Sequence, residues 1–251
     1  MTLLSIIGTG PGDPDYLIPA ARDAVLASTD LVGYDLYLDL LGALTDGKTQ
    51  HRLPLGQEVE RARTALDLAA AGHPTALVSS GDPGIYAMAA VVYELLDSEH
   101  RWPQVQVQTL PGISAIQLLA ARSGAPLGHD FCTISLSDLL TPRDTILTRI
   151  KAAADGDFII GFYNPASRRR QTLLPAAREL LLQQRPGSTP VLIGRQLGRP
   201  DEHITRTDLA QLNPAQVDML SLVLVGNRET RAGNGFVYTP RGYAAKHGHP
   251  Q

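Results

Sequence analysis

Short apolar runs that alternate with helical patterns are the feature of this 251-residue chain that most constrains its fold. In the segment 58–72, Val59, Ala62, Leu66 and Ala69 recur at steps of three and four, as on one face of a helix. The first half holds strand candidates at 3–7, 31–34, 75–79 and 105–109, and helix candidates at 17–28, 58–72, 85–98 and 113–124. This alternation predicts a mainly parallel sheet with helices packed on it.

The alternation restarts after residues 124–130, GAPLGHD, where two glycines and one proline predict a hinge. Strand candidates follow at 131–137, 158–163, 190–194, 203–207, 220–226 and 236–240, and helix candidates at 142–155 and 172–184. The last strands lie close together in the sequence, which favours a mixed sheet. We therefore predict an α/β protein of two domains, residues 1–123 and 124–251, with a cleft between them.

Charge and cysteine content narrow the class of protein. The formal net charge is −3, so no overall basic character favours nucleic acid. The single cysteine, Cys132, excludes an intrachain disulfide, a zinc site built from cysteines and an iron–sulfur cluster held by this chain alone. Residues 1–12 lack the basic start of a signal peptide, and no apolar run reaches the roughly eighteen residues of a membrane span. We expect a cytoplasmic protein with no nucleic-acid or membrane partner.

Three loops rich in glycine and proline directly follow predicted strands. They are GTGPGDP (8–14), SSGDPG (79–84) and LPGISA (110–115). Glycine lets the backbone approach a ligand closely, and proline stiffens a turn. Because ligands of open α/β sheets bind beyond the carboxyl ends of the strands, these loops form the predicted ligand site.

The first loop has the Gly-x-Gly spacing of a dinucleotide-binding turn, but its other residues argue against that cofactor. Pro11 and Pro14 remove backbone donors that would hold a pyrophosphate, and Asp13 would repel it. A tight turn without a ligand is the alternative for this loop. In the second loop, Asp82 is placed either to cap the following helix or to face a cationic or hydroxylated ligand.

Together with four later motifs, these loops resemble the tetrapyrrole methyltransferases, which use S-adenosyl-L-methionine. The later motifs are GAPLGHDFCTISLSDLLTP (124–142), FYNPASRRR (162–170), GRPDEHI (198–204) and LVGNRETR (224–231). The resemblance covers about residues 3–243. It implies two α/β domains of the tetrapyrrole methylase type, with the cofactor and the active site in the cleft between them, and a homodimer.

The segment 124–142, taken with FYNP, is most similar to the family members that methylate C17 of a corrin precursor and contract its ring. This resemblance implies conversion of precorrin-3B to precorrin-4 in cobalamin biosynthesis, with C20 becoming an exocyclic acetyl group. GRQLGRPDEHI (194–204) is more similar to the oxygen-dependent branch of that pathway than to the cobalt-containing branch. The alternatives are the equivalent reaction on cobalt-precorrin-3 and a non-catalytic tetrapyrrole carrier.

The cofactor contacts of the family can be carried onto matching positions of this chain. They fall on Pro11, Gly81, Asp82, Ile85, Ser114 and Ala115 in the first domain, and on Asn164, Leu197 and Asn227 in the second. Related uroporphyrinogen methyltransferases have a lysine where this chain has Gln57, and a carboxylate near the position of Asp35. Gln57 cannot act as a cationic acid, so this acid–base pair is not transferred.

The implied ring contraction needs a group that accepts a proton. His129 is the residue type that does so near neutral pH, and Asp130 could share this role or orient His129. In the alternative interpretation all three residues are structural: Asp130 is a capping residue, His129 binds a backbone carbonyl, and Cys132 is a small buried apolar side chain. No G-x-S-x-G segment supports a serine hydrolase, and one histidine with one cysteine is too few ligands for a metal. The segment is therefore predicted to be a wall of the substrate site, without a metal.

The carboxylates of a tetrapyrrole substrate require cationic partners. Arginine can bind a carboxylate through two parallel hydrogen bonds. The alternative for each arginine is a solvated helix start. The predicted substrate-binding residues are Ser135, Ser137, Asp138, Arg168, Arg169 and Arg195.

Overall fold

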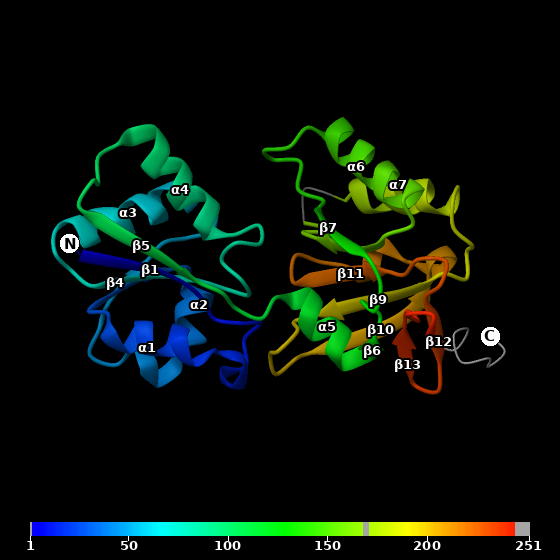
Figure 1. Cartoon of the computed structure of the whole chain (residues 1–251), viewed down its shortest axis with the longest axis horizontal. Helices are drawn as coiled ribbons and strands as arrows, with labels where there is room; N and C mark the ends of the chain where they lie inside the picture. Colours follow the sequence, from blue (N-terminus) through cyan, green and yellow to red (C-terminus); the bar gives the residue numbers. More distant parts are fainter. Residues whose placement is uncertain (1, 168–170, 244–251) are drawn as a thin grey trace. The chain divides into compact units, whose positions relative to one another are not determined.

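The computed structural model describes residues 2–167 and 171–243, which belong to two α/β units, Met1–Ala115 and Ile116–Gln251 (Figure 1). The first unit contains β1 (Thr2–Gly8), η1 (Pro14–Tyr16), α1 (Pro19–Ala27), β2 (Asp30–Gly33), α2 (Asp35–Asp39), η2 (Gly42–Thr45), β3 (Thr49–Arg52), α3 (Glu58–Ala70), β4 (Thr75–Ser79), α4 (Met88–Glu99) and β5 (Val105–Leu110). The second contains α5 (Ala115–Ser123), β6 (Gly124–Ala125), β7 (Phe131–Ser135), α6 (Arg143–Asp155), β8 (Ile159–Tyr163), α7 (Leu173–Leu182), β9 (Pro190–Arg195), β10 (His203–Asp208), η3 (Leu209–Gln211), η4 (Pro214–Gln216), β11 (Ser221–Val225), β12 (Arg231–Gly233) and β13 (Phe236–Tyr238).

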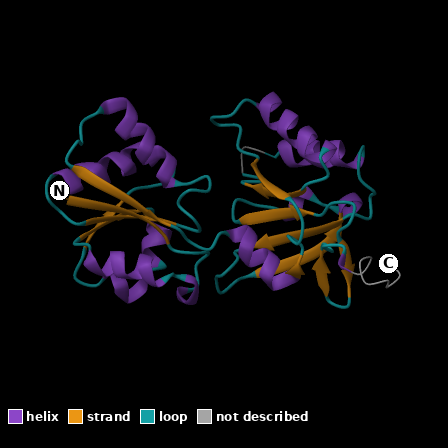
Figure 2. Cartoon of the chain, viewed as in Figure 1, coloured by secondary structure: helices purple, strands orange, loops and turns teal. Residues whose placement is uncertain are grey.

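The sheet of the first unit has five parallel strands in the order β3-β2-β4-β1-β5. Helices α3 and α4 cover one face, where Leu66 and Val92 pack against Ile6. Helices α1 and α2 cover the other, where Val25 and Leu38 join the second core (Figure 2). Because both faces are covered, β4 is buried along its whole length. The prediction of a mainly parallel sheet is confirmed.

Two elements of this unit differ from the sequence-based expectation. Strand β3 reads TQHR and has no apolar residue, because it is an edge strand whose side chains reach solvent. Helix α4 begins at Met88 instead of 85. Tyr86 has φ 52, a left-handed conformation that cannot continue from a helix, so the segment before Met88 is a turn.

A buried carboxylate with two histidines lies where β2 begins. The carboxylate of Asp30 accepts one hydrogen bond from Oγ1 of Thr29 at 2.8 Å, and it lies 2.8 Å from Nε2 of His51 and 3.2 Å from Nδ1 of His73. Lys48 donates to two nearby carbonyls. Burial acts to raise the pKa of Asp30, but these hydrogen bonds and the charge of His73 outweigh it, so the pKa lies below its usual value.

We expect Asp30→Asn to lower the free energy of unfolding at pH 7 by about 2 kcal/mol, because bonds to a charged acceptor are lost. A carboxylate whose pKa falls on folding stabilises the protein above its unfolded pKa, about 3.9, and stops doing so as pH drops through the folded value. Urea unfolding at several pH values should therefore show the two proteins converging below about pH 4. A difference that stays constant with pH would contradict this account.

The main sheet of the second unit is mixed, in the order β10-β9-β11-β8-β7. Strand β7 pairs with β8 in parallel, whereas β11 is antiparallel to both β8 and β9. Helices α6 and α7 cover one face, with Ile150 and Leu181 packed around Phe162. A second sheet joins β12, β13 and β6. The expected mixed sheet is confirmed.

Helix α5 and the segment after it belong to the second unit. A Cβ on Gly161 or Gly194 would collide with Ile116 or Leu119 of α5, so these glycines let the helix lie directly on the sheet. Of residues 124–130, expected to be a hinge, Gly124 and Ala125 form β6 and pair with β13, and the N–H of Thr239 donates to the carbonyl of Ala125. The structure therefore divides the chain after Ala115, ahead of the expected boundary at 123/124.

No helix within residues 2–167 and 171–243 combines the length and the apolar character needed to cross a membrane.

Candidate functional site: glycine loops at the strand ends

The three glycine loops follow β4, β1 and β5, which are neighbours in the first sheet, so the loops meet at one edge. The N–H of Thr9 donates to the carbonyl of Ser79 at 2.9 Å. Gly10 and Gly81 exchange two backbone hydrogen bonds, of 3.3 and 2.8 Å, in an isolated bridge. The predicted convergence of these loops is confirmed within the first unit.

Glycine is required where the loops touch. A Cβ on Gly8 would lie 2.8 Å from the backbone N of Gly112, and a Cβ on Gly112 would overlap the carbonyl of Gly81. No side chain can shift to relieve these contacts, because the atoms it would meet are backbone. Gly81 also has φ +64, which favours glycine.

Asp82 links two of the loops through its carboxylate. One oxygen accepts from the N–H of Gly84 at 2.7 Å, and the other accepts from the N–H of Gly112 at 3.1 Å. The first bond lies within the turn that precedes α4. Because α4 begins at Met88 and has no side-chain cap, the expectation that Asp82 caps this helix is wrong. The second reaches thirty residues along the chain and fixes the β5 loop against the β4 loop.

The charge of the loops limits the ligand. Residues 8–14, 79–87 and 110–115 contain no Lys, Arg or His and two carboxylates, Asp13 and Asp82. Asp13 accepts from the N–H of Asp15 at the start of η1. A pyrophosphate would find no cation here, whereas backbone carbonyls and a carboxylate suit a positively charged ligand.

The second unit has a corresponding set of strand ends. Strands β7, β8 and β9 are parallel to one another, so their carboxyl ends lie at one edge. Asn164, directly after β8, has φ 50 and donates from Nδ2 to Oγ of Ser135 at 3.0 Å. The N–H of Ser137 donates to the same oxygen at 3.3 Å. The structure thus brings together three of the predicted site residues.

The family model of the tetrapyrrole (corrin/porphyrin) methylases matches residues 3–213. The chain belongs to this family. It is 43% identical over 249 residues to the precorrin-3B C(17)-methyltransferase of Sinorhizobium sp, covering 96% of this chain and 97% of that one. It is 44% identical to the probable cobalt-factor III C(17)-methyltransferase of Salmonella typhimurium, covering 96% and 99%.

A further relative is the cobalamin biosynthesis protein CobIJ of Mycobacterium tuberculosis, 44% identical over 96% of this chain; the chain spans about half of that relative's length, 48%. Among solved structures, the methyltransferase CobJ matches with a TM-score of 0.92 at 38% identity, covering 96% of this chain and 100% of CobJ. The uroporphyrin-III C-methyltransferase of Thermus thermophilus, complexed with S-adenyl homocysteine, has a TM-score of 0.67 at 23% identity, covering 89% and 96%, and this likeness concerns the fold alone.

The remaining residues carried over from the tetrapyrrole methylases lie in varied surroundings. In the first unit Pro11 and Ser114 are buried, Ile85 and Ala115 are half-buried, and all four lie in or beside the loops. Leu197, two residues after β9, is 6% exposed and packs over Gly194. Its side chain therefore belongs to the core.

Three predicted site residues lie at the opposite edge of the second sheet. His129 and Asp130 precede β7, and about 16 Å of extended strand separates Asp130 from Ser135. Both side chains are exposed, and Nδ1 of His129 accepts from the N–H of Asp130. Asn227 follows β11, which is antiparallel to β8 and β9, so it lies at the same edge as His129 and Asp130. Its Oδ1 accepts from Oγ1 of Thr230 and from the backbone N–H of Glu229. The structure does not bring these three residues to the Ser135–Asn164 edge.

Among the predicted arginines, Arg195 already has a carboxylate partner. Its Nε lies 2.8 Å from Asp218. Burial acts to raise the pKa of Asp218, but hydrogen bonds from Ser221 and Leu220 and the charge of Arg195 bring it below its usual value. A substrate carboxylate would have to compete with Asp218 for this guanidinium. Arg168 and Arg169 lie outside the described residues.

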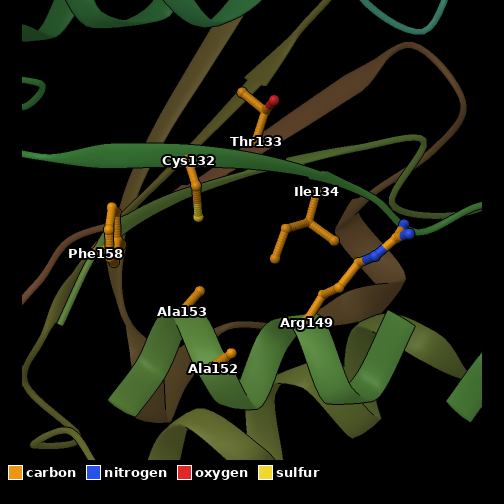
Figure 3. Close-up of a pocket in the computed structure, with 7 residues that line it drawn as sticks. All are labelled: Cys132, Thr133, Ile134, Arg149, Ala152, Ala153 and Phe158. Carbon is orange, nitrogen blue, oxygen red and sulfur yellow. The ribbon is translucent and has the colours of Figure 1, made fainter. Parts of the chain in front are cut away.

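Cys132 lines an open cavity of about 350 Å³ between β7 and α6, and its Sγ points into it (Figure 3). The lining residues are Cys132, Thr133, Ile134, Arg149, Ala152, Ala153 and Phe158. Burial raises the pKa of the Cys132 thiol, so it stays protonated at neutral pH. Within the described residues no group of three His, Cys, Asp or Glu side chains is arranged to hold a metal.

Two side chains that hold the second-unit edge together escaped the sequence-based prediction. The hydroxyl of Tyr163 accepts from the N–H of Ile116 at 3.3 Å, at the start of α5. Arg143, the first residue of α6, donates to Oγ1 and the carbonyl of Thr172. Tyr163 stands inside FYNP, so this motif was a signal for it. No sequence motif indicated Arg143, because its partner Thr172 is distant in the sequence.

Proposed function

We propose that this chain is an S-adenosyl-L-methionine-dependent C-methyltransferase that acts on a carboxylated tetrapyrrole. The observation that carries the proposal is the set of three interlocked loops, which contains the carboxylate of Asp82 and no cationic side chain. Such a site favours a positively charged sulfonium over a phosphate. The names of the relatives supply the reaction class, and the complex of the Thermus enzyme supplies the chemistry of the ligand.

In this proposal the first unit holds and aims the cofactor. Gly81, Asp82 and Ile85 contact its methionyl and ribose portions, and the Pro11 loop and the Ser114–Ala115 segment complete the site. When bound, the cofactor supplies an electrophilic methyl group on a positively charged sulfur. Both oxygens of Asp82 keep a free lone pair after their backbone bonds, so the carboxylate can bind a ligand hydroxyl and still link the loops. Rigid alignment of the reacting groups contributes about 7–11 kcal/mol in favourable cases.

In the second unit we assign the substrate to the edge that carries Ser135 and Ser137, beside Asn164. Asn164 is the position carried over as a cofactor contact, and Ser135 and Ser137 are predicted substrate contacts. Their mutual hydrogen bonds give this edge a fixed polar surface. Asp138 directly follows Ser137 and adds a carboxylate to this edge. Because this carboxylate repels an anionic substrate, binding of the substrate there requires nearby cations.

We propose precorrin-3B as the substrate and precorrin-4 as the ring-contracted product, in cobalamin biosynthesis. The relative named for precorrin-3B is 43% identical, and the one named for cobalt-factor III is 44% identical, so the cobalt-containing substrate is the second candidate. The test offers each substrate separately with S-adenosyl-L-methionine and follows the product by mass spectrometry. A mass gain of one methyl group with only one substrate would assign the branch, and binding without methylation would indicate a carrier.

Asp82→Asn provides a test of the cofactor loops. The amide oxygen can accept only one of the two backbone hydrogen bonds, so the β4 and β5 loops lose their fixed spacing. We expect the Kd for S-adenosylhomocysteine to rise about tenfold, equivalent to about 1.4 kcal/mol. Calorimetry measures this change. Asp46→Asn, at an exposed carboxylate in the same unit, is the matched control and should leave the Kd unchanged.

We also propose that the protein is cytoplasmic and forms a homodimer. The family resemblance supports the homodimer. Sedimentation equilibrium of the purified protein tests the dimer, which would give twice the mass of the chain.

A further inference from the structure

A turn with two exposed leucines follows β7 in the second unit. Residues 136–142, here called the leucine turn, join Ser135 to the first residue of α6. Leu139 is 75% exposed and Leu140 is 98% exposed, more than any other large apolar side chain of the described residues. A single exposed leucine is ordinary, but two adjacent ones form an apolar tip that contributes nothing to the core.

The start of the leucine turn is anchored at the substrate edge proposed above. Oγ of Ser135 accepts from Nδ2 of Asn164 and from the N–H of Ser137. The N–H of Leu136 donates to the carbonyl of Tyr163 at 2.8 Å. Three hydrogen bonds therefore fix the position from which the two leucines project.

The end of the leucine turn carries a positive charge. Arg143 is half-buried, and its Nη1 donates to Oγ1 of Thr172 at 2.9 Å. Within residues 2–167 and 171–243, Arg143 has no carboxylate partner. By contrast, Arg195 at the same edge is paired with Asp218. The turn thus combines an apolar tip with a cation whose charge is not neutralised.

We propose that the leucine turn and Arg143 bind the tetrapyrrole substrate, with Leu139 and Leu140 against the apolar face of the macrocycle and Arg143 on one peripheral carboxylate. This proposal rests on the proposed function. It is argued from complementarity: a macrocycle with an apolar face and a rim of carboxylates matches an apolar tip beside an unneutralised cation. Among the described residues of the second unit, neither leucine is buried in the core.

The first test replaces both leucines by glutamine, in Leu139→Gln/Leu140→Gln. We expect the KM for precorrin-3B to rise about tenfold, while the Kd for S-adenosylhomocysteine and the thermal midpoint stay unchanged. Leu26→Gln, at a leucine that is 55% exposed on α1, is the control and should leave the KM unchanged.

Several outcomes of this test would overturn the proposal. The first is an unchanged KM in the double variant, and the second is a joint change in cofactor affinity and thermal midpoint. The third is a change in oligomeric mass with an unchanged KM, which would assign the turn to self-association. If the wild-type protein binds S-adenosylhomocysteine but methylates neither precorrin-3B nor cobalt-factor III, the proposed function itself fails. That result is seen before any variant is made, so the two failures are distinguishable.

The second test separates the charge of Arg143 from its structural contacts. We expect Arg143→Gln to raise the KM about fivefold and Arg143→Lys to recover part of that loss. Raising the ionic strength should increase the KM of the wild type more than that of Arg143→Gln, because salt screens only a charged contact. Arg149→Gln, on the same helix, is the control. Equal salt dependence of the wild type and Arg143→Gln would show that Arg143 does not meet a substrate carboxylate.

Discussion

Gly112→Ala is expected to abolish measurable binding of S-adenosylhomocysteine, with a Kd raised by about a hundredfold or more. The added Cβ would overlap the carbonyl of Gly81 and lie 3.0 Å from the Cα of Gly8. Both neighbours are backbone atoms of the other two loops, so the β5 loop must move away as a whole. That movement breaks the bond from the Gly112 N–H to Asp82 and separates the three loops that form the site.

The same substitution should also lower the free energy of unfolding by about 1–3 kcal/mol, the usual cost of overpacking. Gly112 does not have a positive φ, so alanine itself is tolerated by the local backbone and the whole effect comes from the contact. Calorimetry and thermal denaturation measure the two effects. Gly233→Ala is the control, because a Cβ there meets nothing within 4 Å. Unchanged affinity in Gly112→Ala would mean that the loops do not hold the cofactor.

Much of the first unit could be predicted because its signals are local. Buried parallel strands appear as apolar runs, and loops with close backbone contacts need glycine at fixed positions. Strand β3 could not be predicted, because an edge strand with polar side chains has neither an apolar run nor an alternation. Within the site, the contacts of Asp82 were likewise only partly predictable. Its turn contact with Gly84 is local, but its bond to Gly112 depends on two loops being adjacent in the sheet.

The polar residues of 124–142 show how closeness in sequence misleads. His129 and Ser135 are six positions apart, yet β7 carries them to opposite edges of the sheet. A strand rises about 3.3 Å per residue, so a short strand is enough to separate two halves of a motif. The partner of Ser135 is instead Asn164, which lies at the end of the neighbouring strand. The segment therefore contains two separate groups that look like one in the sequence. Ser135 and Ser137 are held by hydrogen bonds at the end of β7, whereas His129 and Asp130 are exposed before it.

The domain boundary depends on packing that the sequence does not display. Helix α5 has an ordinary apolar pattern, and a glycine follows it, so the sequence suggests that a domain ends there. The side chains of Ile116 and Leu119 instead lie over two glycines of the second sheet, so α5 packs on the sheet of the second unit. Which sheet a helix joins depends on the room that small residues leave on that sheet.

Arg185 is a fully buried cation that joins the ends of three elements of the second unit. Its side chain is 0% exposed. Nη1 donates to the carbonyl of Gly226 and Nη2 to that of Phe158, both at 2.6 Å, while Nε lies 4.0 Å from Asp157. Burial lowers the pKa of Arg185 below its usual value, but a guanidinium remains charged. Within residues 2–167 and 171–243, two carbonyls and a distant carboxylate are thus the partners that compensate Arg185 for lost hydration.

Arg185→Ala is expected to lower the free energy of unfolding by about 3–5 kcal/mol, because two buried carbonyls lose their donors and a cavity replaces the side chain. Urea unfolding monitored in the second unit measures the loss. Arg178→Ala is the matched control: Arg178 also binds two carbonyls, those of Leu209 and Ala210, but its side chain is 26% exposed, so water can replace it at a cost of about 1 kcal/mol. Equal losses in the two variants would show that burial does not set the contribution of Arg185.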